Sequence, residues 1–328
     1  MTQVLPPYYQ VKNEYEKLDN LIINHERTGK AYMRFAFTVE LWFMEGWTLE
    51  KRQILVDLAR YYFNLFHGKI THYQKDGATR YSKMRDDKFP NYYELLPSRL
   101  DADEYFHIYL RSSESDLMLY DFAALSVAEN RKERRPLSYL QFRTPLAWVK
   151  QDIAQVTFAL QEMCSKLNPT NGVAGLSPVF EPGREDPKYY FPYLRRFPGF
   201  DWPNGSWGLA VGAERKIRGV NWLTILDEGY SRDLGGPAAL AEHLGEDIHL
   251  HVYDGGVIIQ AGPEPFLGDR NANIWPEHYR TVNRALKHLR FEAFKPSRTY
   301  LKVPHGTALD AHDESLKWLR RFDIVETE

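Results

Sequence analysis

Residues 219–290 constrain the fold most, because their apolar runs and glycines fix the order of a strand and a helix. Val220–Leu226 is a mostly apolar run broken by Thr224, typical of a central strand buried on both faces. Gly235-Gly236-Pro237 then begins a helix that Gly245 ends, since proline suits the first helical turn and glycine suits the residue after the last. The segment therefore predicts a strand followed directly by a helix.

The same segment continues with a hairpin. Ile248–Tyr253 and Val257–Ala261 are strand-like runs separated by Asp254-Gly255-Gly256, and an Asp-Gly pair between apolar runs is the strongest short-range hairpin signal. Pro276 then begins a helix with an apolar face. A hairpin beside a strand-to-helix connection predicts antiparallel pairing.

The first half of the chain has a similar order. Arg34–Met44 alternates apolar and polar residues as a half-buried strand does, and Thr48 is placed to cap a helix that stops at Gly68. Residues 71–100 form a long excursion with short irregular elements. Thr144-Pro145 begins a further helix, after strands at Tyr105–Leu110, Leu117–Val127 and Leu137–Arg143.

These patterns predict an α+β fold with a mixed, largely antiparallel sheet and helices covering one face. We expect a helical extension over residues 1–30 and a single α+β domain over residues 31–328. Two related β-α-β-β halves, residues 31–181 and 208–328, are joined by an aromatic and proline-rich loop over residues 182–207. The similar order of elements suggests an approximate structural duplication.

Composition narrows the class of partner. The chain has 328 residues with a formal net charge of -2 and a pI of about 6.6, so it lacks the basic field of a nucleic-acid coat or of a protein bound to an anionic membrane. Its start resembles no secretory signal, and no apolar run reaches the roughly 20 residues of a membrane helix. The single cysteine, Cys164, is expected to be a buried apolar residue. We therefore expect a cytoplasmic protein.

No catalytic or metal motif stands out. His249 and His251 share one strand face with His243 upstream, but they lack a carboxylate or cysteine at ligand spacing, so solvent-facing histidines are favoured over a metal site. Phosphate-binding loops and serine-hydrolase elbows are absent from the sequence. We predict neither catalytic residues nor a metal, and no cofactor.

Several polar and aromatic residues have plain structural explanations. Asn271 or Asn273 is expected to cap the helix at Pro276, in preference to binding a cation with Asp269. Trp222 is expected in the core with its indole hydrogen bonded. Gln260 is either part of a satisfied polar network, which we favour, or part of a recognition surface.

The aromatic loop has two open interpretations. It mixes aromatic residues with arginine, as protein interfaces do, but a packed lid over the sheet has the same composition. The candidate binding residues of this loop are Tyr189, Tyr190, Tyr193, Arg195, Arg196 and Trp202.

The order and spacing of these segments resemble the type VI secretion immunity protein family of bacteria, formerly a family of unknown function. The resemblance rests on Arg195–Asp201, Arg218–Thr224, Gly256–Pro263 and Gly268–Asn271, and it covers about residues 30–290. The chain departs from the family pattern at Arg270, where small or aliphatic residues are common. The matching motif positions are Gly219, Asn221, Trp222, Gly235, Gly236, Gln260, Gly262, Gly268, Asp269 and Asn271.

The resemblance implies a non-catalytic cytoplasmic antitoxin that binds a cognate type VI effector toxin and occludes its active site or substrate groove. Some members are similar to partners of nuclease effectors, so a nuclease is one candidate toxin. Acidic residues at 101–104 or 310–314 could then face a basic groove, although ordinary solvated charge is the simpler interpretation. The alternatives are a hydrolase using His249, His251 and Asp269, and a structural adaptor of the secretion apparatus.

Overall fold

A computed structural model describes residues 15–113, 117, 119–134, 136–180, 185–203, 207, 215–293 and 299–323. The first half contains α1 (Tyr15–Asn20), β1 (Ile22–Asn24), β2 (Ala31–Phe43), α2 (Leu49–Leu65), β3 (His72–Gln74), β4 (Tyr81–Lys83), α3 (Asn91–Leu95), β5 (Phe106–Arg111), β6 (Asp121–Ser126), the 3₁₀ helix η2 (Glu129–Arg134), β7 (Ser138–Thr144), α4 (Leu146–Gln151), α5 (Ile153–Leu167) and β8 (Asn171–Phe180).

The remaining elements are α6 (Pro187–Arg196), β9 (Leu223–Asp227), α8 (Glu228–Asp233), α9 (Gly236–Leu244), β10 (Ile248–Tyr253), β11 (Gly256–Ala261), η3 (Arg270–Ala272), α10 (Glu277–Leu286), η4 (Lys287–Leu289) and α11 (Ala311–Leu319). No helix in these described ranges is long and apolar enough to cross a bilayer.

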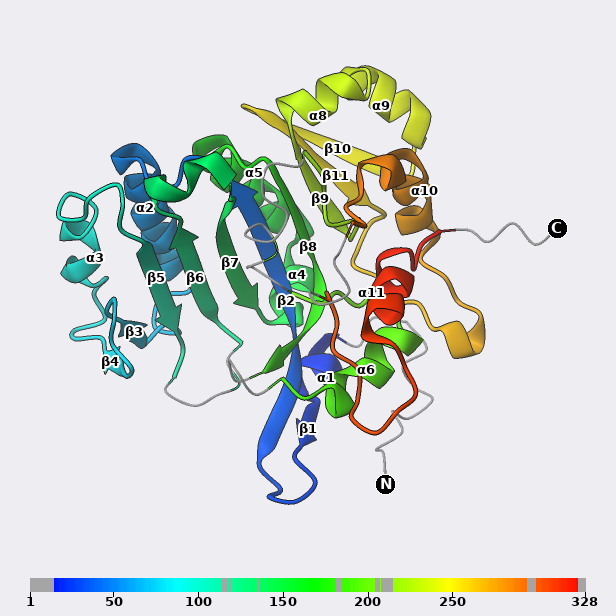
Figure 1. The fold of residues 1–328 in the computed structure, drawn as a ribbon, viewed down its shortest axis with the longest axis horizontal. Helices are drawn as coiled ribbons and strands as arrows, with labels where there is room; N and C mark the ends of the chain where they lie inside the picture. The colour runs from blue at the N-terminus through cyan, green and yellow to red at the C-terminus, as the bar shows by residue number, and fades with distance from the viewer. Residues whose placement is uncertain are drawn as a thin grey trace.

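One sheet of 11 strands runs through both halves of the chain (Figure 1). The strand order is β10-β11-β9-β8-β2-β7-β6-β5-β3-β4, with β1 paired to β2, and each of these neighbouring pairs is antiparallel. The long strand β2 pairs with both β7 and β8, and β8 in turn pairs with β9 of the second half. The predicted α+β class with a largely antiparallel sheet is confirmed.

Local signals fixed most element ends. The Thr48 hydroxyl accepts from the Lys51 amide at 3.3 Å and begins α2, and Gly245 ends α9 as predicted. Tyr253 pairs with Gly256 across Asp254-Gly255, so the predicted hairpin is β10–β11. Of the expected helical extension over residues 1–30, the described part contains α1 and the strand β1, which pairs with β2.

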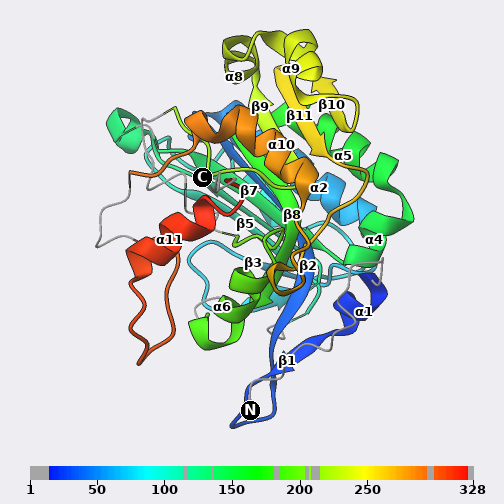
Figure 2. The ribbon, with the colours of Figure 1, turned by 90° about the vertical axis from the view of Figure 1, so that its right-hand side faces the viewer.

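Helices lie on both sides of the sheet, so the prediction that they cover one face is wrong. Figures 1 and 2 place α2, α4 and α5 behind the sheet and α6 and α11 in front of it. On the rear side, Tyr62 of α2 contacts the rings of Phe122 and Phe142. Both faces of β2 are consequently buried along most of its length.

The predicted aromatic loop over residues 182–207 is wrong in its central part, where the chain forms α6. Pro187 starts this helix and the Asp186 side chain accepts from the Lys188 amide at 2.9 Å. Pro192 lies inside the helix, although proline removes a backbone donor there. Burial of the aromatic side chains of α6 offsets the loss of that backbone hydrogen bond. Residues 181–184, 204–206 and 208–214 lie outside the described ranges.

Two other expected elements differ from the structure. The helix expected from Thr144-Pro145 is two helices, because Asp152 interrupts it and caps α5 by accepting from the Gln155 amide at 2.8 Å. After β9, Asp227 caps the unexpected short helix α8. In both cases the side chain of an aspartate caps the N-terminus of the new helix.

Two phenylalanines are expected to differ widely in how much each contributes to the free energy of unfolding. Phe37 is fully buried in β2, with its ring 5.7 Å from that of Trp222, whereas Phe158 of α5 is 61% exposed. We expect Phe37→Ala to lower the free energy of unfolding by about 3 to 5 kcal/mol, and Phe158→Ala by less than about 0.5 kcal/mol. Urea denaturation followed by tryptophan fluorescence measures both, and equal losses would contradict this account of the core.

Candidate functional site

The family-motif segments meet in space through their own side chains. Arg196, at the end of α6, forms a two-pronged ion pair with Asp269: its Nε lies 3.0 Å from Oδ1 and its Nη2 lies 2.7 Å from Oδ2. Asp269 also accepts from the Asn271 amide at 3.0 Å, which begins η3. We call the Arg196–Asp269 pair the clamp, because it fixes η3 to the end of α6.

The clamp lowers the pKa of the Asp269 carboxyl. Burial alone would raise the pKa of the Asp269 carboxyl, but the hydrogen bonds from Arg196 and from the Asn271 amide hold that pKa below its usual range. The Asp269 side chain is 2% exposed, so its charge is compensated almost entirely by these two groups. The Asp269 carboxylate that the less favoured cation site would need is therefore bound by an arginine.

The N-terminus of α10 is not capped as predicted. The helix α10 begins at Pro276 without a side-chain cap, so the expectation that Asn271 or Asn273 caps it is wrong. Asn271 is exposed, and Asn273 has the left-handed conformation that ends η3, while its side chain accepts from the Trp275 indole at 3.0 Å.

A second contact joins the other motif segments in the interior. Arg218 is 2% exposed and its guanidinium bonds Glu40 of β2 at 2.6 Å, Tyr300 at 2.9 Å and the Asp201 carboxylate. Arg321 lies 3.6 Å from the same Asp201. Two arginines thus face two carboxylates, and we call these four side chains the buried ion cluster.

The buried ion cluster continues along one face of the sheet. Gln141 donates to Glu40 at 2.7 Å and accepts from Arg143 at 2.9 Å, and Arg143 pairs with Asp121 at 2.5 Å. Strand register places these residues on the face opposite α2. Burial raises the pKa of the Glu40 carboxyl, and the nearby Arg218 charge opposes that rise.

The remaining motif residues support the backbone. Trp222 is buried and its indole donates to the Gly262 carbonyl at 3.1 Å, and Gln260 donates to the same carbonyl at 3.0 Å, as predicted for a core tryptophan and a satisfied amide. Asn221 is fully buried against Gly175. The motif glycines with positive φ are Gly219, Gly235, Gly236, Gly262 and Gly268.

Gly199, between α6 and the buried ion cluster, shows why this region tolerates no side chain. Its amide donates to the Leu267 carbonyl at 2.7 Å, and a Cβ here would lie 1.9 Å from the Phe266 carbonyl oxygen. Two motif segments therefore pass in direct backbone contact.

The candidate toxin-binding residues separate into buried and exposed members. Tyr189, Tyr190 and Tyr193 are each less than 10% exposed, and the Tyr190 ring stacks on Trp202 at 4.0 Å. Arg196 is held in the clamp. Only Arg195 among the six presents most of its side chain, 59%, to solvent. Whether these residues bind a toxin stays a prediction.

Three exposed or half-exposed residues beside the clamp were not predicted as site residues. Arg270 follows Asp269 directly, and its guanidinium lies 5.4 Å from the ring centre of Trp275. Arg280 of α10 lies 3.9 Å from the same ring. Arg195, Arg270, Arg280 and Trp275 will be called the arginine patch. The sequence signals for it were the pair Arg195-Arg196 and the arginine that follows Asp269.

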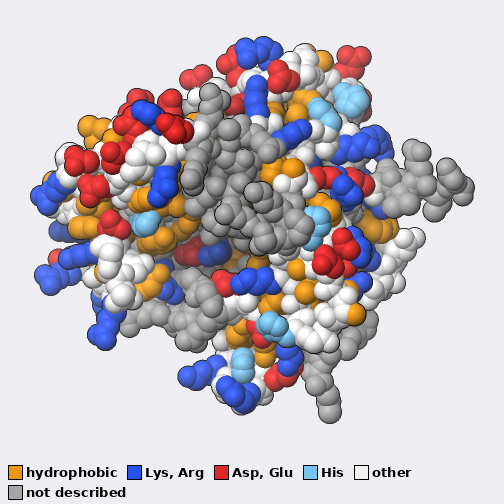
Figure 3. All heavy atoms as spheres, in the orientation of Figure 1, with side chains coloured by type: hydrophobic (Ala, Val, Ile, Leu, Met, Phe, Trp, Pro, Cys, Tyr) orange, Lys and Arg blue, Asp and Glu red, His pale blue; other side chains and the backbone are white. Residues whose placement is uncertain are grey.

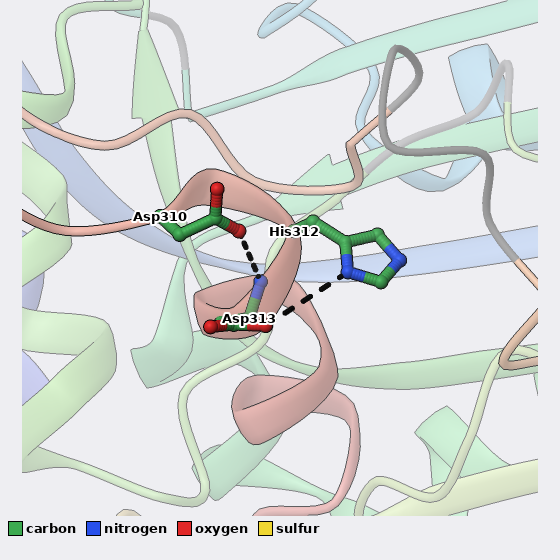
Figure 4. A group of neighbouring side chains, drawn as sticks. All are labelled: Asp310, His312 and Asp313. Carbon is green, nitrogen blue, oxygen red and sulfur yellow. Dashed lines mark hydrogen bonds and ion pairs between the residues drawn. The ribbon is translucent and has the colours of Figure 1, made fainter.

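The candidate histidines are not gathered into a metal site in the described ranges. His249 and His243 are exposed, and His251 Nε2 lies 2.8 Å from the Gln260 side-chain oxygen. The group that does have ligand-like spacing is Asp310, His312 and Asp313 at the start of α11 (Figure 4). There Asp310 caps the helix by accepting from the Asp313 amide at 2.8 Å, which explains the cluster without an ion.

The two acidic segments are partly neutralised within the chain. Glu314 is 6% exposed and pairs with Lys317 at 2.8 Å, and the Glu104 carboxylate accepts from the Asp101 amide at 2.8 Å. On the face drawn in Figure 3, acidic and basic side chains are interspersed. Neither acidic segment is thus set apart from ordinary surface charge.

Comparison with known proteins agrees with the motif positions. A family model described as TsiV, type VI immunity for VRR-NUC, matches residues 58–322. The solved structure of a Pseudomonas aeruginosa T6SS protein has a TM-score of 0.78 and 22% sequence identity to this chain, over 94% of this chain and 89% of that chain, and so shares the fold. No match was found among curated proteins.

The buried ion cluster predicts a large effect of removing its central charge. Arg218→Met leaves the Glu40 and Asp201 carboxylates without their main partner, so we expect the free energy of unfolding to fall by about 3 to 5 kcal/mol. The control is Arg60→Ala, which breaks exposed pairs with Asp57 and Glu94 and should cost less than about 1 kcal/mol. Chemical denaturation distinguishes them, and similar losses would show that the cluster is not stabilising.

The clamp predicts a pH-dependent contribution to stability. Because the folded pKa of Asp269 is below its unfolded value, the contribution is complete above that unfolded value of about 4 and is lost as pH falls through the folded pKa. We expect Asp269→Asn to destabilise the protein by about 2 kcal/mol at pH 7, and this difference to shrink below pH 4. A difference between the two proteins that stays constant from pH 7 to pH 3 in urea denaturation would contradict this.

Proposed function

Because the chain belongs to the family of type VI immunity proteins for VRR-NUC, we propose that it binds and neutralises a cognate type VI effector toxin whose toxic domain is a VRR-NUC nuclease. The observation that carries the proposal is the family match over residues 58–322. This range contains the clamp, Arg218, Asp201 and Arg321 of the buried ion cluster, and all the motif positions. The match therefore covers most of the chain, while the central strand β2 with Glu40 precedes the matched range.

The proposed mode of action is stoichiometric binding without catalysis. The residues of the alternative hydrolase site have structural partners: Asp269 is held by Arg196, and His251 contacts Gln260. Occlusion of the nuclease active site or of its substrate groove needs no cofactor, and the toxin domain itself is the partner in place of nucleic acid or membrane. We place the protein in the cytoplasm, where a nuclease toxin would reach its nucleic acid.

Protection also sets a requirement on association. An antitoxin must bind before the toxin cleaves its target, so fast and tight association with complementary charge is expected. On the face drawn in Figure 3 acidic and basic side chains are interspersed, which allows charge complementarity to be local to one interface.

We expect inhibition to follow molar ratio. Purified effector nuclease domain is titrated with this protein, and cleavage of plasmid DNA is measured; activity should fall in proportion to added protein and vanish near one equivalent. Heat-denatured protein is the control. If one part in a hundred abolished cleavage after long incubation, the protein would act as an enzyme and the binding proposal would fail.

A further inference from the structure

We propose that the arginine patch, made by Arg195, Arg270, Arg280 and Trp275, is the surface that docks acidic side chains of the effector's nuclease domain. This rests on the proposed function and assigns the part of the surface that performs it.

The clamp assembles the patch. Arg196 and the buried Asp269 form an ion pair, and the residues next to them in sequence, Arg195 and Arg270, are thereby brought to the same side of the molecule. The chain between β11 and α10 passes beside α6 there (Figure 2). Trp275 is fixed by its indole bond to Asn273, and it carries Arg270 and Arg280 against its ring.

The charge of the patch is only partly compensated. Within the described ranges, no carboxylate lies within ion-pair distance of Arg270, and Arg195 reaches Glu314 only at 4.0 Å, while Glu314 is already paired with Lys317 at 2.8 Å. Arg280 pairs with Glu277, which is 67% exposed. Partial burial lowers the pKa of Arg270, and repulsion from the guanidinium groups of Arg195 and Arg280 lowers it further, against the opposing charge of Glu314. An anionic partner would relieve that repulsion.

The chemistry of the patch fits carboxylates on a protein. Guanidinium groups bind carboxylates through two parallel hydrogen bonds, and arginine with tryptophan is the combination that dominates binding energy at protein interfaces. Nucleases that work through metal ions gather carboxylates at their active sites, because these are the ligands such ions take. A cluster of acidic side chains on the toxin domain is therefore the complementary surface.

The test measures the affinity of the purified effector nuclease domain for wild type and for Arg195→Ala/Arg270→Ala by biolayer interferometry. Both side chains are exposed, so the double variant should keep the melting temperature of the wild type. We expect it to bind at least about thirtyfold more weakly, with a smaller loss of affinity between 50 and 500 mM salt. The matched control is Arg131→Ala/Lys132→Ala, which removes two exposed charges from η2 and should bind within twofold of wild type.

The outcomes separate this inference from the proposed function. Failure of the wild type to bind the nuclease domain would overturn the proposed function itself. If the wild type binds and the patch variant binds within threefold of it, or if the control loses as much affinity, only the patch assignment fails. Binding of labelled duplex DNA by wild type, lost in the patch variant, would instead assign the patch to nucleic acid and overturn docking to a protein.

Discussion

The buried ion cluster is the constraint on which the rest of the structure depends. Arg218 joins Glu40, in the central strand, to Asp201, which follows α6, and Arg321 ties the C-terminal helix region to the same carboxylate. Two charges of each sign balance in a site that excludes water. Removing any one of them leaves another uncompensated, so the cluster requires all these segments to be in place together.

This requirement explains why the sheet is continuous across the two halves of the chain. The strands β2, β8 and β9 pair side by side, and the cluster holds the segments before β9 against β2 from the front of the sheet. The expected division at residues 181 and 208 separates the chain in sequence, but β8 and β9 hydrogen bond directly across it. Whether the halves arose by duplication stays a prediction.

Local signals in the sequence predicted the fold well, and long-range contacts explain what they missed. The hairpin at Asp254-Gly255 and the cap at Thr48 depend on a few neighbouring residues. By contrast, Arg218 and Glu40 are 178 residues apart, and no pattern in the sequence pairs them. The sequence left the tyrosines of α6 open between an interface and a packed lid, because aromatic residues with arginine have the same composition in a core and at a surface. Arg270 and Arg280 were missed because the clamp and Trp275 bring them together.

The clamp has a consequence for how such a protein can change over evolution. Asp269 is buried and Arg196 is mostly buried, and each has an exposed arginine next to it in sequence. Positions 195 and 270 can therefore accept new side chains, or exchange charge, while positions 196 and 269 keep the backbone where it is. Substitutions at positions 195 and 270 alone would then adapt the surface of the protein to a toxin whose own surface changes. Each such substitution would cost little stability.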